Sequence, residues 1–152
     1  KLLPAEPVAR TATIEALMFQ VASLGPMLGQ YLVFAAAWGN EFPKVTARYF
    51  SEVSRIMGVL NARLATRDYL AGNEFTIADI AVAPWIRLCE IHPACGGFPL
   101  NQNQQLKQWW DRVSERPSVR RGFSIPEPFP VEKQFEGFVK AVVGLGDLHP
   151  AE

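Results

Sequence analysis

The sequence predicts an all-α fold, a single bundle of helices. Three observations indicate this: two long segments have apolar residues at helical spacing, a capping box marks the start of a further helix, and no segment shows a strand pattern. The chain has 152 residues, of which 49% are hydrophobic and 20% charged. This composition and length suit one globular domain with one core.

The first helix is expected to begin at Thr11 or Thr13, because either hydroxyl can cap a helix N-terminus. It should run to about Trp38, with a kink at Gly25-Pro26 where proline removes a backbone donor. A second long helix should follow Pro43, because apolar residues recur there at helical spacing. These residues are Val45, Tyr49, Val53, Ile56, Leu60 and Leu64.

The stretch from Ala16 to Gly39 carries no charged residue, and about 20 apolar residues can span a bilayer. A membrane helix is therefore the first rival interpretation. The polar side chains within the stretch and the break at Gly25-Pro26 argue against it, because a broken helix exposes backbone polar groups. We expect a buried core helix and no membrane partner.

A capping box marks the start of a third helix within residues 70–86. Thr76 is placed to accept from the backbone N–H of Asp79, whose carboxylate can reach back to the N–H of Thr76. Phe75 and Ile80 have the spacing of a hydrophobic staple around this cap. Both capping residues are therefore interpreted as structural and not catalytic. Pro84 should bend the helix one turn later.

The C-terminal third continues the helical pattern. A loop rich in Pro, Gly and Asn (residues 92–103) leads to a helix through residues 106–116, which ends before Pro117. Its apolar face consists of Leu106, Trp109, Trp110 and Val113. Residues 117–122 are expected to form a short turn, and a Pro-rich run then leads to a last amphipathic segment. The apolar positions of that segment are Phe135, Phe138, Val139, Val142 and Val143.

Composition excludes several classes of function. Fifteen basic residues balance fifteen acidic ones, so the strongly basic surface of a nucleic-acid-binding protein is missing and no nucleic-acid partner is expected. The two cysteines, Cys89 and Cys95, are too few for a disulfide framework, and with two histidines no zinc-ligand spacing occurs. We expect no metal and a reducing, cytoplasmic compartment. The start at Lys1 is interpreted as that of a fragment or processed product.

Several segments in order resemble bacterial and fungal glutathione transferases, nearest to the nu-class or yeast prion-like branch. The resemblance rests on SLGPMLGQ, the pair Arg48-Tyr49, VLNARL, YLAGNEFTIADIAVAPWI and RPSVRRGFSIP, and covers about residues 8–127. It implies the glutathione transferase C-terminal type of helical bundle at residues 11–126. Residues 1–10 would then be a linker remnant, and residues 127–152 a Pro-rich C-terminal extension with a short amphipathic helix.

The resemblance also implies that two domains have different roles in the reaction. In that family an N-terminal thioredoxin-like domain binds most of the co-substrate glutathione, and the helical bundle supplies much of the wall for the second substrate and joins in a homodimer. The reaction needs a glutathione thiolate, and the groups that favour its ionisation belong to the first domain. We therefore expect no catalytic residue here and no activity from this chain alone. The parent activity would be glutathione conjugation, or glutathione-dependent disulfide or peroxide reduction.

Five residues are candidates for substrate binding by resemblance. Arg48 matches an arginine that in nu-class relatives lies near glutathione and reaches it from the neighbouring subunit. Its alternative is a solvated helix residue paired with Glu52. The other four would face a small apolar electrophile or peroxide, and their alternative is core packing. They are Phe19, Met27, Gln30 and Phe34. Relatives often carry a His pair after this Gly-Gln, where the chain has residues 31–33 (Tyr-Leu-Val).

A second function class stays open beside the enzyme. Helical domains of this family also serve as non-catalytic protein-interaction modules, for example in translation factors and tRNA synthetases. Such proteins normally extend into other domains, and a thioredoxin-like reading frame upstream of Lys1 would favour the enzyme.

Overall fold

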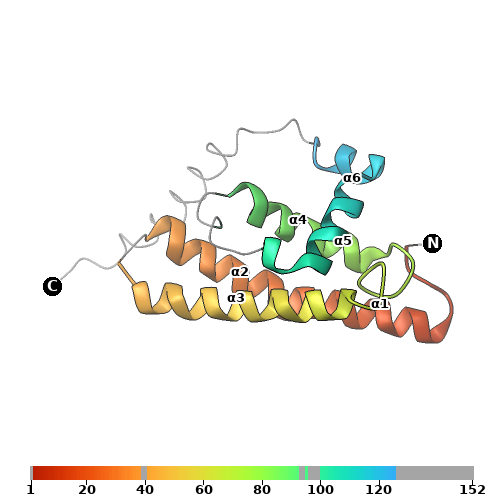
Figure 1. Cartoon of the computed structure of the whole chain (residues 1–152), viewed down its shortest axis with the longest axis horizontal. Helices are drawn as coiled ribbons and strands as arrows, with labels where there is room; N and C mark the ends of the chain where they lie inside the picture. Colours follow the sequence, from red (N-terminus) through yellow and green to blue (C-terminus); the bar gives the residue numbers. More distant parts are fainter. Residues whose placement is uncertain (1, 39–40, 93–94, 96–99, 126–152) are drawn as a thin grey trace.

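The computed structural model describes residues 2–38, 41–92, 95 and 100–125. Its α-helices are α1 (Pro7–Phe19), α2 (Gly25–Leu32), α3 (Pro43–Leu64), α4 (Ile77–Ile91), α5 (Gln104–Ser114) and α6 (Pro117–Gly122). The run of α1 and α2 lies beside α3, and α4, α5 and α6 lie on one side of this pair (Figure 1). Extended pairing in the described part is limited to one isolated bridge, between Tyr69 and Gly72. The predicted all-α bundle is confirmed.

The core lies where α2, α3, α4 and α5 meet. Each helix turns one apolar stripe inward, as expected for helices that bury one face and leave the other in water. The largest fully buried side chains are Trp109, Leu24, Leu28, Ile56, Met57, Leu60, Leu70, Ile86, Leu106, Val53, Val82 and Val113. The stripe predicted for α3 is buried from Val53 to Leu64 and half-buried at Val45 and Tyr49, near the start of the helix.

The predicted start of the first helix is wrong. α1 begins at Pro7, and the carboxylate of Glu6 accepts hydrogen bonds from the backbone N–H groups of Val8 and Ala9 at 2.9 and 2.7 Å. These bonds lower the pKa of Glu6, because they favour the ionised form. Thr13, one of the two expected caps, is instead buried inside the helix, where its hydroxyl donates to the carbonyl of Ala9.

Where the sequence predicted a kink, the structure has a π-helical turn at Gln20–Leu24, directly before Gly25-Pro26. The backbone N–H of Gly25 donates to the carbonyl of Gln20, five residues back, so this turn holds one more residue than an α-helical turn. Gly25 also has a packing role. A Cβ atom there would lie 2.9 Å from the side chain of Gln20 and 3.2 Å from the ring of Trp85 on α4. The glycine therefore lets the first helical run approach α4.

The helical run Pro7–Ala36 is long and apolar enough to cross a membrane by length and composition alone. Core helices of soluble proteins share these two properties. In this bundle the run places Ala16, Leu24, Leu28 and Leu32 in the core that it forms with the other helices.

The capping box at the start of α4 is confirmed and belongs to a larger network. The carboxylate of Asp79 is fully buried, and one oxygen accepts from the backbone N–H and the hydroxyl of Thr76 at 2.9 and 3.2 Å. The other oxygen accepts from the backbone N–H of Leu70 at 3.0 Å and from the indole N–H of Trp109 at 2.8 Å. Asp79 therefore joins α4, the preceding loop and α5. The hydroxyl of Thr76 accepts from the N–H of Ala78.

The loop before α4 is shaped by a tight turn. Tyr69 and Gly72 exchange two backbone hydrogen bonds, of 2.8 and 3.1 Å. Gly72 has a φ of 154°, which a residue with a side chain rarely adopts. The turn points the N–H of Leu70 at Asp79, so the loop is fastened to the helix that follows it.

The structure confirms the predicted apolar face of α5, all four residues of which are buried. Residues 117–122 were expected to form a turn and instead form the short helix α6. Pro84 lies inside α4, which continues to Ile91. The amphipathic helix predicted beyond residue 127 lies outside the described residues.

Replacing Asp79 by alanine should destabilise the domain by at least about 3 kcal/mol, because three N–H donors lose their acceptor in a buried site and each costs roughly 1–3 kcal/mol. Thr76→Ala should cost about 1 kcal/mol, the usual value of an N-cap. Urea denaturation followed by circular dichroism measures both. Asp111→Ala, at an exposed position of α5, is the control and should change stability by less than about 0.5 kcal/mol. A cost for Asp79→Ala no larger than that for Thr76→Ala would contradict the network.

Candidate functional site

An aromatic cluster forms where the first helical run leads into α3, at the left end of the bundle in Figure 1. Phe34 is at its centre: its ring stacks on Tyr49 with centroids 5.6 Å apart and an interplanar angle of 17°. The ring centroids of Trp38 and Phe42 lie 4.9 and 6.0 Å from that of Phe34. Phe34 lies in a second π-helical turn, Val33–Ala37, and Trp38 follows directly after that turn.

The cluster keeps part of its surface in water. Phe34, Trp38 and Tyr49 are half-buried, and Phe42 is 41% exposed. Half-exposed aromatic rings can bury an apolar ligand against their faces and edges. Of these rings, only Phe34 was predicted as a candidate. Trp38, four residues after Phe34, could also have been predicted from the sequence. Phe42 and Tyr49 could not, because only the folded chain places their rings beside Phe34.

The other predicted wall residues do not gather around Phe34 as one patch. Phe19 and Met27 are partly buried and pack against the core, which agrees with their alternative interpretation, and Gln30 is exposed. Phe19 precedes Phe34 by four helical turns, roughly 20 Å along the axis. A small molecule that contacts Phe34 therefore has Gln30 within one turn and Phe19 out of reach.

Arg48 lies beside Tyr49 in α3, with a side chain that is 69% exposed. One of its guanidinium nitrogens is 3.9 Å from a carboxylate oxygen of Glu52, an ion contact longer than a hydrogen bond. Glu52 is held more closely by Arg55, through contacts of 2.9 and 2.7 Å. The hydrogen bond from Arg55 lowers the pKa of Glu52 below its ordinary value. The pairing of Arg48 with Glu52 expected from the sequence is present.

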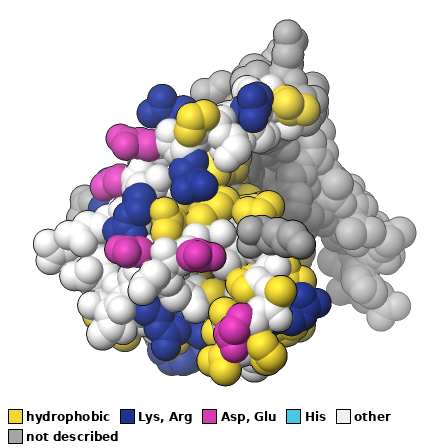
Figure 2. Space-filling view, turned by 90° about the vertical axis from the view of Figure 1, so that its right-hand side faces the viewer, with side chains coloured by type: hydrophobic (Ala, Val, Ile, Leu, Met, Phe, Trp, Pro, Cys, Tyr) yellow, Lys and Arg dark blue, Asp and Glu magenta, His cyan; other side chains and the backbone are white. Residues whose placement is uncertain are grey.

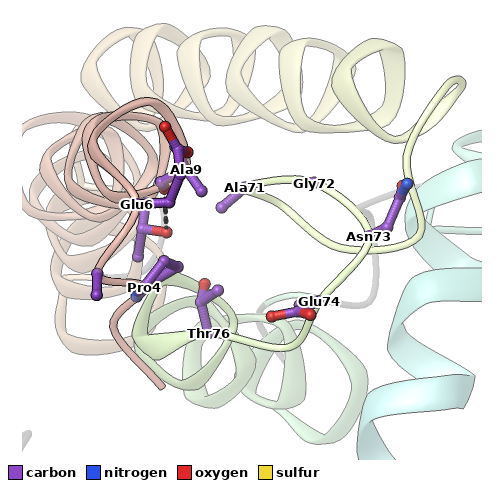
Figure 3. Close-up of a pocket in the computed structure, with 10 residues that line it drawn as sticks. Pro4, Glu6, Ala9, Ala71, Gly72, Asn73, Glu74 and Thr76 are labelled. Carbon is purple, nitrogen blue, oxygen red and sulfur yellow. Dashed lines mark hydrogen bonds between the residues drawn. The ribbon is translucent and has the colours of Figure 1, made fainter. Parts of the chain in front are cut away.

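A cavity of about 510 Å³ lies between the N-terminal segment, the start of α1 and the loop before α4 (Figure 3). Two of its polar groups serve the fold: the carboxylate of Glu6 caps α1, and the hydroxyl of Thr76 belongs to the α4 cap. Asn73 and Glu74 also line it. None of the five predicted substrate-binding residues lines it. The sequence did not predict this cavity, because it forms between segments that lie far apart in the sequence.

Both cysteines are buried and in the free thiol form. A hydrogen bond to Cys95, reinforced by burial, raises the pKa of the Cys89 thiol far above its ordinary value. Burial, with both cysteines nearby, also raises the pKa of Tyr31. Because the thiolate is the reactive form, Cys89 is an inert core thiol at neutral pH. In the part of the chain that the structure describes, no three His, Cys, Asp or Glu side chains form a group able to hold a metal ion.

Comparison with known proteins identifies the family to which the chain is related. Residues 24–117 match the family described as "Glutathione S-transferase, C-terminal domain". The disulfide-bond oxidoreductase YfcG of Escherichia coli is 36% identical over 110 residues, which are 72% of this chain and 49% of that protein. Glutathione S-transferase 1 of Schizosaccharomyces pombe is 30% identical over 131 residues, covering 80% of this chain and 57% of that protein.

Solved structures give the same result. One similar structure is that of a glutathione transferase from Burkholderia graminis with two glutathione molecules bound per subunit. The superposition covers 85% of this chain and 55% of the transferase chain, with a TM-score of 0.77 and 32% sequence identity. A family member from Pseudomonas fluorescens with two glutathione molecules bound covers 83% of this chain and 57% of its own, with a TM-score of 0.76 and 38% identity. The chain spans about half the length of these relatives. It belongs to the glutathione S-transferase C-terminal domain family.

Proposed function

We propose that this chain is the second-substrate domain of a glutathione S-transferase, whose complete form conjugates glutathione or uses it to reduce disulfides or peroxides. The supporting observation is the superposition of more than four fifths of the chain on solved transferases that hold glutathione. The relative named as a disulfide-bond oxidoreductase favours reduction as the activity. The nu-class or yeast prion-like branch is proposed as the finer family assignment from the resemblance of the sequence motifs.

The requirements of the reaction indicate which domain supplies which groups. The reaction needs a thiolate held beside hydrogen-bond donors. Both cysteines of this chain are buried, and the raised pKa of Cys89 keeps its thiol protonated. Glutathione as co-substrate, and the groups that ionise it, are therefore assigned to a thioredoxin-like domain. In this proposal the chain contributes a wall and is inactive by itself.

The aromatic cluster around Phe34 is proposed as the part of that wall that contacts the second substrate, a small apolar electrophile or peroxide. The rings of Trp38, Phe42 and Tyr49 offer apolar faces and edges, and Gln30 offers an exposed amide one turn away. An open, ring-lined surface accepts apolar molecules of varied shape. Phe19 and Met27 pack against the core, and Phe19 lies too far along the helical run to belong to this wall.

Arg48 is proposed to reach a carboxylate of glutathione in the complete protein. Its side chain is exposed, and its guanidinium has donors to spare, because its contact with Glu52 is only an ion contact of 3.9 Å. A guanidinium fork matches a carboxylate with two parallel hydrogen bonds.

The complete protein is further proposed to be a cytoplasmic homodimer. Apolar side chains in the first helical run remain exposed at Ile14, Met18 and Val21, with exposures of 42%, 48% and 52%. They follow one another at helical spacing, so they form a stripe that a second subunit or domain can cover. A membrane contact would use the same stripe, and solubility of the chain without detergent distinguishes the two.

The chain alone should show no conjugation of 1-chloro-2,4-dinitrobenzene and no glutathione-dependent reduction of hydroxyethyl disulfide or cumene hydroperoxide. Joined to the half of YfcG that it does not match, it should gain at least one of these activities. Spectrophotometric assays of the two proteins at equal concentration measure this. Activity from the chain alone would contradict the assignment of the chemistry to another domain.

Arg48→Ala in that fusion should weaken glutathione binding by roughly tenfold, because a charge-assisted bidentate contact is lost. Arg55→Ala is the matched control, since it removes the other arginine that shares Glu52 and should change the affinity less than twofold. Isothermal titration calorimetry with glutathione measures both. Equal effects would leave Arg48 a structural residue only.

Phe34→Ala in the same fusion should raise the KM for the apolar electrophile by about tenfold or more, as expected when an apolar contact worth roughly 1.5–3 kcal/mol is removed. The KM for glutathione should stay within twofold. Val59→Ala, an exposed apolar position on α3, is the control. A rise confined to the KM for glutathione would show that the cluster does not contact the second substrate.

A further inference from the structure

The helical run from α1 through α2 contains two π-helical turns, Gln20–Leu24 before α2 and Val33–Ala37 after it. In such a turn the backbone N–H groups donate to carbonyls five residues back, so the turn holds one more residue than an α-helical turn. These turns are rare in proteins and often lie at functional sites. The second one carries Phe34, and it is therefore part of the proposed substrate wall.

The two turns differ in their local sequence. Gly25-Pro26 follows the first turn, and proline has no backbone N–H to donate to the carbonyl four residues back. The second turn has the sequence Val-Phe-Ala-Ala-Ala, without proline or glycine. Alanine favours the α-helix more than any other residue does, so the local preference of this segment opposes the π-helical form. Contacts with the rest of the fold are therefore needed to stabilise it.

Two pairs of rings connect this part of the run with α3. Tyr31, ahead of the turn, is buried, and its ring centroid lies 5.9 Å from that of Phe50. Phe34, inside the turn, stacks on Tyr49 with centroids 5.6 Å apart. Tyr31 and Phe34 are three residues apart, whereas their partners are adjacent in α3 and point in directions about 100° apart. An extra residue changes the phase of the run, which lets both pairs form together.

We propose that the π-helical turn Val33–Ala37 is a specificity-determining element, because its extra residue sets the angle at which Phe34 meets Tyr49 and so shapes the wall for flat aromatic substrates. This inference rests on the proposed function where it concerns substrates. A flat ring gains stacking or edge contacts with aromatic side chains beyond the burial of its area. An alkyl group of similar size gains the burial alone, so the wall distinguishes the two.

The rings of the cluster offer both kinds of aromatic contact. Phe34 and Tyr49 are nearly parallel, with an interplanar angle of 17°. Phe42 is nearly perpendicular to Phe34 and to Trp38, with interplanar angles of 88° and 83°. A flat guest can therefore lie parallel to one ring while its edge meets the face of another, and aromatic pairs prefer these two arrangements.

The faces of these rings suit an uncharged guest. The cation–π contacts found in residues 2–38, 41–92, 95 and 100–125 use the rings of Tyr69, Phe75 and Phe123, which lie outside the cluster. Figure 2 shows the opposite end of the bundle, where Lys, Arg, Asp and Glu side chains lie between hydrophobic ones. The arginines in these contacts therefore leave the ring faces of the cluster to a neutral substrate.

The first test uses the fusion with the unmatched half of YfcG and deletes Ala36, which removes the extra residue of the turn. The ratio of kcat/KM for cumene hydroperoxide to that for tert-butyl hydroperoxide should fall about fivefold, because the ring of Phe34 turns away from Tyr49. If the fusion catalyses conjugation, the ratio for benzyl and allyl isothiocyanate should fall likewise. Deletion of Glu41, an exposed residue of the same connection to α3, is the matched control and should leave both ratios within about twofold.

The second test needs no catalysis and uses the 152-residue chain. An NMR titration, followed at the indole N–H of Trp38, compares benzyl alcohol with cyclohexanol. The unchanged chain and the chain without Glu41 should bind the aromatic alcohol about threefold more tightly, and the chain without Ala36 should bind both alcohols equally. If the fusion is inactive, the proposed function fails, and the two alcohols still decide this inference.

Circular dichroism verifies that each variant is folded. If the chain without Ala36 does not fold, Tyr49→Leu removes the stacking partner of Phe34 instead and should abolish the preference for benzyl alcohol. The inference is overturned if the unchanged chain binds both alcohols equally, or if the two deletions have equal effects. A folded chain without Ala36 that keeps the preference for benzyl alcohol would overturn it too.

Discussion

The buried carboxylate of Asp79 is the contact on which the arrangement of the bundle depends. It accepts hydrogen bonds from the loop at Leu70, from the α4 cap at Thr76 and from the ring of Trp109 on α5. Burying a carboxylate is unfavourable unless donors surround it, so each partner is held in place by the others. The loop that Asp79 fastens ends at Phe75, so this side chain also helps to place the ring of Phe75 beside the start of α4.

The sequence predicted those parts of the fold that local rules control. The capping box and the apolar stripes of α3 and α5 depend on residues three to seven positions apart, and these predictions are confirmed. The start of α1 was missed because glutamate is not among the preferred N-cap residues, although proline is favoured at the first helical position, which Pro7 occupies. The further partners of Asp79 could not be predicted, since Trp109 lies 30 residues away in sequence.

The candidate site was less predictable for a related reason. Phe34 could be named from one helix, but the rings of Phe42 and Tyr49 come from residues beyond that helix. The π-helical turn also changes the phase of the helix between Phe19 and Met27, so a count of 100° per residue misplaces the side chains on either side of it. The cavity between the N-terminal segment, α1 and the loop before α4 arises from contacts between segments distant in sequence, which no local pattern encodes.

Glu52 contacts two arginines, and this affects how easily Arg48 can exchange Glu52 for another partner. If Arg48 turns towards another anion, Glu52 keeps both short contacts with Arg55, so no carboxylate is left without a counter-charge. The exchange starts from an exposed side chain, so binding a carboxylate must order Arg48 and remove part of its hydration shell. The cost of the exchange therefore lies in Arg48 itself and not in an ion pair lost at Glu52.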